Sequence, residues 1–486
     1  MAKSKKAKTQ KKVIKKKKRR KGNSVIKAGK IENGNVIILG FTGSIGSGAT
    51  FVSKGFKQNL VENGRYFELS KYITNRFRKE RGTKKEPTIK QKQDYGNKLR
   101  YKYGNSALVN MCLQNLRISE RNKSFTDDTI ILIDGIRNDG EVRSLRAFPN
   151  FYLVSVHANE DVRINRLVGD EASRSLFDTK EEFKAADERD RQEDKKTGQQ
   201  VNKCNYLADI IINNDDVLQD DTDRKRQFFS ETVEKYIPTM KAIREGKRPP
   251  DHPPAINEIL MTTAYGMSQR SSCEKRKVGA IIAYVSEYKE LKDKIKRPED
   301  NVRFKIVSSG YNEVPLGTDP CKLGQYGMCY RDHIKRQLAK EIKFCPNCGK
   351  RIPTGISASF KKFSEYKCSK CKTVILEKYL PGRVKSAGRL LDICRALHGE
   401  EAAILGLEKV IESSQEKLQD RGKLILYTTT FPCNLCANKI VEAGIKCVYY
   451  SEPYAEEESK NILVNAGVDV IKFEGVKSTA YFRLYS

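Results

Sequence analysis

Short runs of aliphatic and β-branched residues recur through the first half of the chain and alternate with stretches of helical character. These runs cover residues 35–41, 130–133, 151–156 and 208–214. Such short runs are typical of strands buried on both faces, and strands that alternate with helices favour a parallel sheet. The pattern therefore predicts an α/β doubly wound domain over residues 35–240.

A proline-rich segment interrupts the pattern after this region. Residues 241–254 contain Pro249-Pro250 and Pro253-Pro254, and because proline fixes φ and cannot continue a helix, we expect a stiff linker. From residue 255 onward, the apolar runs predict the order helix, strand, strand, helix, strand, helix. Residues 255–486 are therefore predicted to form a second α/β domain.

The first predicted strand leads into a glycine-rich turn that opens a helical stretch. A strand, a glycine turn and a helix are the context of a phosphate-binding loop, because backbone N–H groups and the helix dipole hold an anion. Ala49 stands where that loop normally has lysine, so we favour a module that binds or senses a nucleotide over a working kinase. A scaffold without any nucleotide is the alternative. The candidate nucleotide and Mg²⁺ residues are Gly43, Gly46, Gly48, Thr50 and Asp134, the last at the end of a predicted strand.

The positive charge of the chain is concentrated at its N-terminus. The formal net charge is +32 over 486 residues, and residues 1–30 contain many lysines and arginines but no acidic residue. Such a block repels itself, so residues 1–34 are predicted to form a disordered basic arm. The arm either binds RNA or DNA through phosphate contacts or serves as a solubilising tail.

Apolar segments and cysteines indicate the compartment that we expect. No apolar run approaches the roughly 18 residues that a membrane span requires, and the basic N-terminus lacks the apolar core of a signal peptide. We therefore expect a cytoplasmic protein without a membrane partner. In that reducing compartment, cysteine pairs with two intervening residues are typical of metal sites rather than disulfides.

One pair of motifs determines the chemistry that we expect of the second domain. His398-Gly399-Glu400 is followed by a strand-like run and then by Pro432-Cys433-Asn434-Leu435-Cys436. Zinc prefers imidazole and thiolate ligands, and a catalytic zinc keeps one position open for water. Glu400 is left over to move protons, since bound zinc lowers the pKa of its water to about 7. The predicted catalytic zinc ligands are His398, Cys433 and Cys436, with Cys394 or Cys447 as a fourth ligand only if this zinc is purely structural.

A long stretch between about residues 317 and 385 is predicted to be an insertion. It contains two Cys-x-x-Cys pairs that are separated by 19 residues. Four thiolates in this arrangement suit a tetrahedral structural zinc, which would hold together a small lysine-rich segment without much apolar core. A redox pair or a set of reactive thiols is the alternative. The predicted ligands are Cys345, Cys348, Cys368 and Cys371.

Residues 255–486 resemble the deoxycytidylate deaminase branch of the zinc cytidine deaminase superfamily. The blocks that carry the resemblance are residues 270–282, Gly310-Tyr311-Asn312 and the two zinc motifs. Gly399 replaces the alanine usual in the family, a change between small residues that leaves zinc ligation untouched. The resemblance implies that Asn312 reaches the deoxyribose. Candidates for contacts to the substrate phosphates are Arg270, Arg276 and Lys277, which could equally be solvated charges.

Residues 35–240 resemble P-loop nucleoside monophosphate kinases through the glycine turn, the Asp-Gly-Ile-Arg sequence that begins at Asp134, and residues 208–214. The pairing of the two domains resembles the two-domain deoxycytidine nucleotide deaminases of bacterial anti-phage defence. That resemblance implies a homo-oligomer and an upstream domain that gates activity, with a nucleoside triphosphate as its candidate ligand.

The resemblance implies hydrolytic deamination of dCTP or dCMP to a deoxyuridine nucleotide and ammonia. In a defence setting, the reaction would deplete the dCTP that replicating phage DNA requires. One alternative is a cytosine deaminase that acts on RNA or single-stranded DNA and is tethered by the basic arm. Another is a regulator without catalytic activity that binds nucleotides and uses zinc only as a structural element.

Overall fold

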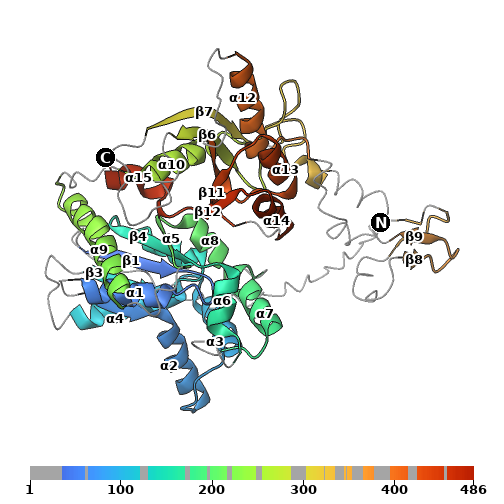
Figure 1. Cartoon of the computed structure of the whole chain (residues 1–486). Coiled ribbons are helices and arrows are strands. Elements are labelled where there is room, and N and C mark those ends of the chain that lie inside the picture. Colours follow the sequence, from blue (N-terminus) through green and yellow to red (C-terminus); the bar gives the residue numbers. More distant parts are fainter. Residues whose placement is uncertain are drawn as a thin grey trace, which may run out of the picture. The chain divides into compact units, whose positions relative to one another are not determined.

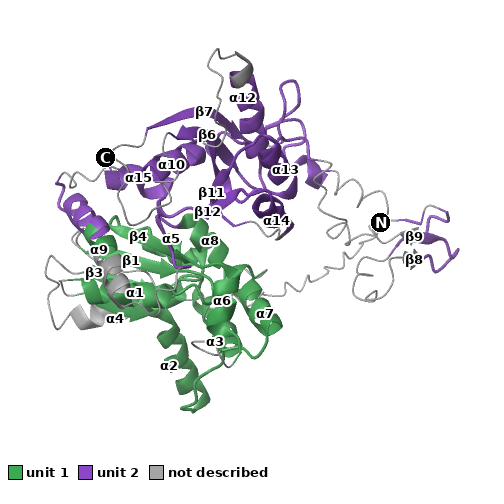
Figure 2. Cartoon of the chain, viewed as in Figure 1, with its two compact units in different colours: residues 1–207, 217–234 green, residues 208–216, 235–486 purple. Residues whose placement is uncertain are grey.

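The chain folds into two compact units, which Figure 2 shows in different colours. One contains residues 1–207 and 217–234, and the other contains residues 208–216 and 235–486. The predicted basic arm, residues 1–34, lies outside the residues that the structure describes. The computed structural model describes residues 36–60, 64–120, 130–169, 176–193, 197–215, 222–247, 254–285, 303–321, 323–333, 344–345, 347–352, 365–376, 394–413, 424–453 and 457–485.

The first unit is built on parallel strands in the order β4-β1-β3-β2. Strands β1 and β3 are buried along their whole length, with Leu39 opposite Leu132. Continuous aliphatic runs predict such strands, and the α/β architecture expected of this region is confirmed (Figure 1). The elements are β1 (Ile37–Thr42), α1 (Ala49–Asn59), β2 (Arg65–Glu68), α2 (Leu69–Arg81), α3 (Ile89–Tyr103), α4 (Ala107–Glu120), β3 (Ile130–Asp134), α5 (Asp139–Leu145), β4 (Phe151–His157), α6 (Glu160–Leu167), α7 (Lys180–Arg191) and α8 (Val201–Leu207).

The second unit includes a strand from the range 35–240, which sequence patterns treat as one domain. Strand β5 (Ile210–Asn213) pairs antiparallel with β13 (Gly475–Val476) near the end of the chain. The N–H of Lys477 donates to the carbonyl of Asp209 at 2.7 Å. Helix α9 (Thr222–Arg244) also contributes its residues from 235 onward to this unit. The second unit therefore combines segments that lie far apart in the sequence.

The main sheet of the second unit has the order β12-β11-β10-β6-β7. Strands β10, β11 and β12 are mutually parallel, whereas β6 runs antiparallel to β10 and to β7. Two further strands, β8 and β9, form a separate antiparallel pair. The elements are α10 (Ile256–Gln269), β6 (Gly279–Val285), β7 (Phe304–Tyr311), β8 (Glu365–Lys367), β9 (Val374–Leu376), α12 (Gly399–Ser413), β10 (Leu424–Thr430), α13 (Asn434–Glu442), β11 (Cys447–Glu452), α14 (Glu457–Asn465), β12 (Asp469–Lys472), β13 and α15 (Ser478–Tyr485).

Successive residues of the central strands serve two different cores. Ile281 of β6 and Ile425 of β10 pack in a cluster with helix α10, whereas Ile282 and Leu426 pack in a cluster with α12 and α13. Because side chains alternate along a strand, both faces of this sheet are covered by helices. The predicted α/β architecture of residues 255–486 is therefore confirmed as well (Figure 1).

A glycine in β7 lets helix α12 approach the sheet closely. A Cβ atom at Gly310 would come closer than 3.0 Å to the backbone nitrogen of Ala403 and to the carbonyl oxygen of Gly399. The hydroxyl of Ser308 in the same strand donates to the carbonyl of Ala403 at 2.6 Å. The backbone of the first turn of α12 therefore lies directly on β7.

We expect Gly310→Ala to destabilise the second unit by about 2 kcal/mol or more, because the added methyl group collides with helix backbone that cannot step aside. Thermal unfolding of the full chain would measure the effect. Gly266→Ala in α10 is the matched control, since a Cβ atom there meets nothing within 4 Å, and alanine is the better helix former. Equal melting temperatures for the two variants would contradict the close packing.

Candidate metal centres and nucleotide loop

Helix α12 begins directly after His398, and its first turn carries Glu400. The N–H of Ala402 donates to the carbonyl of His398 at 2.9 Å. The Oε2 atom of Glu401 accepts a hydrogen bond from the N–H of His398 at 3.2 Å. A carboxylate that returns from the first turn to the residue before the helix satisfies one of the N–H groups that lack a helical partner. These contacts fix the backbone of His398 at the helix entrance.

Two cysteines come from the start of α13. Cys433 precedes the helix, and its carbonyl accepts a hydrogen bond from the N–H of Ala437 at 2.8 Å. Cys436 lies in the first turn and is 1% exposed. Strand β10 is buried throughout and ends just before Cys433, so it delivers both thiols to the carboxyl edge of the sheet. The positive end of a helix favours the thiolate form.

The structure brings His398, Cys433 and Cys436 together. One ligand atom from each lies within 4.8 Å of the others, and the Nδ1 atom of His398 is 3.3 Å from both sulfur atoms. The hydrogen bond with Cys436 lowers the pKa of Cys433 to about 4, and the hydrogen bond with Cys433 raises the pKa of His398. One nitrogen and two sulfur donors that converge in this way fit a zinc ion with a fourth position open.

Glu400 lies beside this donor set. Its side chain is 4% exposed, and its Oε2 atom is 3.7 Å from the Sγ atom of Cys436. Burial raises the pKa of Glu400, because an apolar environment disfavours the charged form. The structure therefore places all four residues of the predicted catalytic centre in one cluster, in which the two cysteines and Glu400 are buried and His398 is half-buried.

Thr428 contacts Glu400 and is absent from the sequence-based set of site residues. Its hydroxyl lies 3.1 Å from the Oε1 atom of Glu400 and 2.9 Å from the carbonyl oxygen of Thr430. Three consecutive buried threonines end the otherwise apolar strand β10. Buried polar residues need partners, so this run of hydroxyls is the signal that could have identified Thr428.

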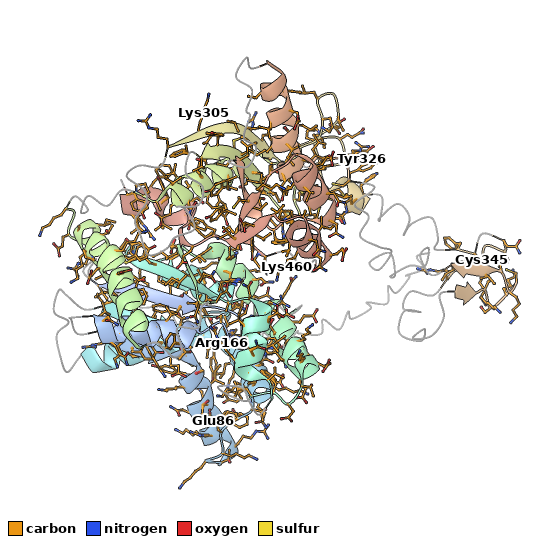
Figure 3. The ribbon with its side chains drawn as sticks, viewed as in Figure 1. Glu86, Arg166, Lys305, Tyr326, Cys345 and Lys460 are labelled. Atoms are coloured by element: carbon orange, nitrogen blue, oxygen red, sulfur yellow. The ribbon has the colours of Figure 1, made fainter. Side chains whose placement is uncertain are left out.

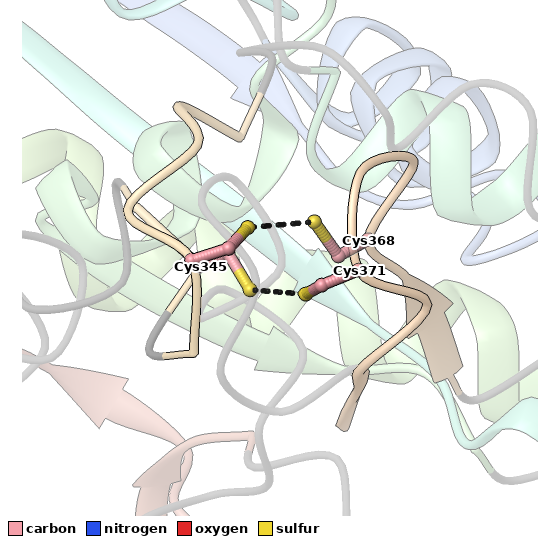
Figure 4. A group of neighbouring side chains, drawn as sticks. Cys345, Cys368 and Cys371 are labelled. Atoms are coloured by element: carbon pink, nitrogen blue, oxygen red, sulfur yellow. Dashed lines mark hydrogen bonds between the residues drawn. The ribbon is translucent and has the colours of Figure 1, made fainter.

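A second group of possible metal ligands lies around the β8–β9 hairpin. The four sulfur atoms of the predicted zinc ribbon lie within 4.8 Å of one another. Cys345 is labelled in Figure 3, and Figure 4 shows the two cross-pairs, in which sulfur atoms are 3.4 Å and 3.6 Å apart. Four thiols at these separations fit a tetrahedral zinc ion. The ligand group is Cys345, Cys348, Cys368 and Cys371.

The two halves of this cysteine cluster have the same backbone conformation. The residue four positions after the first cysteine of each pair has a positive φ: Gly349 at 67° and Lys372 at 60°. In each half, the N–H of that residue donates to the carbonyl of the first cysteine at 2.9 Å. Lys372 is the only non-glycine residue with a positive φ among the described residues. The left-handed conformation costs roughly 1–2 kcal/mol outside glycine, which indicates that the turn is imposed by its surroundings.

The glycine turn of the first unit connects β1 to α1. Gly46 and Gly48 have φ values of 81° and 87°, a region that residues with a Cβ atom avoid. The hydroxyl of Thr50 donates to the Oδ2 atom of Asp134 at 2.7 Å. Burial raises the pKa of Asp134. The structure thus brings the candidate Mg²⁺ residues Thr50 and Asp134 together, while nucleotide and Mg²⁺ binding stay predictions.

Two arginines of α6 donate hydrogen bonds to backbone carbonyls of the glycine turn. The Nη1 atom of Arg163 donates to the carbonyl of Ile45 at 3.0 Å, and that of Arg166 donates to the carbonyl of Gly46 at 3.2 Å. Arg163 is itself fixed by two hydrogen bonds to Asp187, at 2.6 Å and 3.1 Å. Sequence reasoning did not identify these arginines, because α6 carries no motif that relates it to the turn.

Comparison with known proteins relates the second unit to a family. Residues 301–452 match the family model described as the cytidine and deoxycytidylate deaminase zinc-binding region. The protein named deoxycytidylate deaminase of Schizosaccharomyces pombe is 25% identical over 344 residues, which cover 70% of this chain and 76% of that protein. Residues 301–452 contain the zinc-binding region of cytidine and deoxycytidylate deaminases. The resemblance carried by the two zinc motifs is thereby confirmed.

A second relationship covers a smaller share of the chain. A UPF0200 protein of Methanoregula boonei is 30% identical over 139 residues, which cover 28% of this chain and 69% of that protein. This stretch of the chain therefore belongs to the UPF0200 family. Among solved structures, the dCMP deaminase of cyanophage S-TIM5 in its apo form is 22% identical, with 45% of this chain and 97% of that chain covered. The TM-score of 0.22 is too low to support any conclusion.

Both ends of the side-chain amide of Asn312 are hydrogen-bonded to backbone. The Oδ1 atom accepts from the N–H of Val278 at 2.8 Å, and the Nδ2 atom donates to the carbonyl of Arg276 at 2.9 Å. The hydroxyl of Ser271 donates to the carbonyl of Asn312 at 2.8 Å. Asn312 therefore fixes the loop before β6, and the predicted contact with deoxyribose stays a prediction.

The three candidate phosphate-binding residues lie around this same loop. Arg270, Arg276 and Lys277 are all exposed. The Nζ atom of Lys277 donates to the carbonyl of Gln269 at 3.3 Å. The structure therefore leaves their charges accessible to an anion, and a role in substrate binding stays a prediction.

Across the described part of the chain, no helix is both long and apolar enough to cross a membrane.

We expect Asn312→Ala to destabilise the second unit by about 2–3 kcal/mol, because the N–H of Val278 and the carbonyl of Arg276 lose their buried partner. Differential scanning calorimetry of the full chain would measure the change. Asn465→Ala, at the exposed end of α14, is the control and should leave the melting temperature within about 1 °C. A shift no larger than that of the control would show that the loop does not depend on Asn312.

Proposed function

We propose that this protein hydrolytically deaminates the cytosine base of a deoxycytidine nucleotide and releases ammonia. The observation that carries the proposal is a buried carboxylate, Glu400, beside one imidazole and two thiols that converge within 4.8 Å. The relative from S. pombe, named deoxycytidylate deaminase, matches over 70% of this chain. Its name supports the same reaction here.

The reaction exchanges the amino group at C4 of cytosine for the oxygen of a water molecule, so protons must be moved between three positions. When zinc is held by His398, Cys433 and Cys436, it lowers the pKa of a bound water and supplies a nucleophile at neutral pH. Glu400 accepts one proton from the attacking water and donates it to N3 of the ring. It then accepts the remaining water proton from the oxygen at C4 and delivers it to the departing amine. Water is consumed and ammonia leaves, so the atoms balance.

Thr428 is the positioning residue for this carboxylate. When Glu400 is ionised, the Thr428 hydroxyl donates to its Oε1 atom across 3.1 Å. When Glu400 is protonated, the same hydroxyl accepts from the acid and donates to the carbonyl of Thr430, which lies 2.9 Å away. One rotatable hydroxyl therefore stabilises the side chain in both states without moving a heavy atom.

We place the substrate phosphates near Arg270, Arg276 and Lys277, which are exposed around the loop that Asn312 holds. Because both ends of the Asn312 amide are engaged with backbone, a contact to deoxyribose would use the second lone pair of its Oδ1 atom or the second N–H of its Nδ2 atom. The substrate is dCMP or dCTP.

In the cell, we infer a cytoplasmic homo-oligomer that depletes dCTP in anti-phage defence. The first unit would gate the deaminase by binding a nucleoside triphosphate and Mg²⁺ at the glycine turn. This part of the proposal is supported by the Thr50–Asp134 hydrogen bond of 2.7 Å next to Gly46 and Gly48, the position in which a hydroxyl and a carboxylate hold Mg²⁺ in P-loop proteins.

The decisive experiment offers dCTP, dCMP, CTP and a cytosine-containing oligonucleotide to the full chain and separates the products by chromatography. We expect a deoxyuridine nucleotide from dCTP or dCMP, and a loss of at least 100-fold in kcat for Glu400→Gln, because the variant cannot carry protons. Glu442→Gln, an exposed acid at the end of α13, is the charge-matched control and should retain full activity.

The other outcomes separate the alternatives. Product from the oligonucleotide alone would replace this proposal by deamination of RNA or single-stranded DNA. Absence of product from every substrate, with zinc shown to be bound, would favour a regulator without catalytic activity. Full activity of Glu400→Gln would remove the proton carrier that the proposal requires.

We propose that the four-cysteine cluster is a second, structural zinc site. The hairpin that carries it has two strands of three residues each, too few to bury an apolar core of their own. The matching turns at Gly349 and Lys372 support a tetrahedral centre, because each directs one Cys-x-x-Cys pair towards the other.

We expect Cys433→Ser and the double variant Cys348→Ser/Cys371→Ser each to lose about one zinc per chain, since removal of a thiolate opens the coordination sphere. Inductively coupled plasma mass spectrometry of purified protein would count the metal. Ser369→Ala, between two of the cysteines, should retain the zinc content of the unsubstituted chain. Unchanged zinc in the double variant would leave the cluster as free thiols.

A further inference from the structure

Helices α2 and α3 form an antiparallel hairpin, residues 69–103, with an unusually high positive charge. Residues 71–102 contain twelve lysines and arginines and only three acidic residues. All three acids already have cationic partners: Glu80 pairs with Lys98, Glu86 lies 2.6 Å from Arg78 and 2.8 Å from Lys92, and Asp94 lies 2.6 Å from Arg189. All the acidic side chains of this hairpin are therefore already in ion pairs within the protein.

Several cations on the hairpin remain available to an external anion. They are exposed and form no ion pair with any described residue, and they occupy the end of α2, the turn and the start of α3. Charges gathered at this density repel one another and gain from a shared polyanionic partner. These cations are Lys79, Arg81, Lys84, Lys85 and Lys90.

Aromatic rings lie between these charges. Phe77 and Tyr95 meet edge to face with ring centres 5.5 Å apart, and the guanidinium of Arg81 lies 5.9 Å from the centre of the Phe77 ring. Both rings line a cavity of about 520 Å³ together with Arg81, Lys85 and Lys98. Tyr101 of α3 is 71% exposed. Glu86, which also lines the cavity, is labelled in Figure 3.

We propose that the α2–α3 hairpin binds a single-stranded polynucleotide. Unpaired cations suit the phosphates of its backbone, and the exposed ring of Tyr101 suits an unstacked base, the combination by which proteins bind single strands without sequence preference. A duplex offers no unstacked base to Tyr101 or to the cavity. The cations are also spread over the end of α2, the turn and the start of α3. This inference is independent of the deamination reaction.

The test uses the full chain and fluorescent oligouridine RNA and oligothymidine DNA, with affinity measured over a range of salt concentrations. The hairpin variant is Lys79→Ala/Lys84→Ala/Lys85→Ala/Lys90→Ala. The matched control removes the same charge from four exposed lysines of the second unit: Lys305→Ala/Lys409→Ala/Lys446→Ala/Lys460→Ala. Both variants retain residues 1–34, so any binding by the basic arm is common to them.

We expect the hairpin variant to lose at least tenfold in affinity and the slope of log K against log salt to fall by about 3, since each lost phosphate contact on a single strand contributes about 0.7. The control should keep the slope of the unsubstituted chain. Tyr101→Ala should weaken oligonucleotide binding about tenfold and leave the binding of inorganic polyphosphate unchanged, because stacking needs a base. The tighter of the two strands identifies RNA or DNA as the partner.

Equal losses in the two four-lysine variants would overturn the proposal, because the binding would then follow total charge alone. Oligonucleotide binding that is unaffected by Tyr101→Ala and has the same salt slope as the binding of duplex DNA would also overturn it, since no base would be involved. Circular dichroism of all variants would show whether the hairpin remains helical. A charge-reversal set, with glutamate at the same four hairpin positions, repeats the test if the alanine set unfolds.

Discussion

The close contact between Gly310 and helix α12 is the constraint on which the deaminase site depends. Because β7 has no side chain at this position, the backbone of the first helical turn lies against the sheet. That turn carries Glu400 and is preceded by His398. Strand β10 lies in the same sheet and ends at the cysteines of α13. The distance between the imidazole and the thiols therefore depends on how closely α12 packs against β7. Contact between two backbones fixes this separation more firmly than contact between side chains would.

The sequence allowed the parts of this site to be predicted where the chemistry needs particular residue types. Imidazole, thiols and a carboxylate have few substitutes at a zinc centre, so His398, Cys433, Cys436 and Glu400 were recognisable as a set. The α/β character of both halves was equally accessible, because strands covered on both faces require continuous aliphatic runs. In both cases, the residue types that the folded structure requires are visible in a short stretch of sequence.

Other features arise from contacts that no local pattern encodes. The hydroxyl of Thr428 meets Glu400 only because β10 lies beside α12, and the arginines of α6 reach the glycine turn across the fold. The amide of Asn312 holds the backbone of residues 276 and 278, a role that its motif did not indicate, and its contact with a substrate sugar stays a prediction. Both the amide and the hydroxyl are buried polar groups, and their partners follow from the need for hydrogen bonds in a dry interior. Such pairings become visible only with coordinates.

The pairing of β5 with β13 has a consequence for the way this protein is made. The strand at residues 210–213 finds its antiparallel neighbour at residues 475–476, within a dozen residues of the end of the chain. Strand β5 therefore gains this partner only after residues 475–476 have been synthesised, long after β5 itself. The proline-rich segment, which the sequence predicts to be a linker between domains, falls inside the sequence range of that unit. A gene split there would yield two fragments of one folding unit rather than two independent domains.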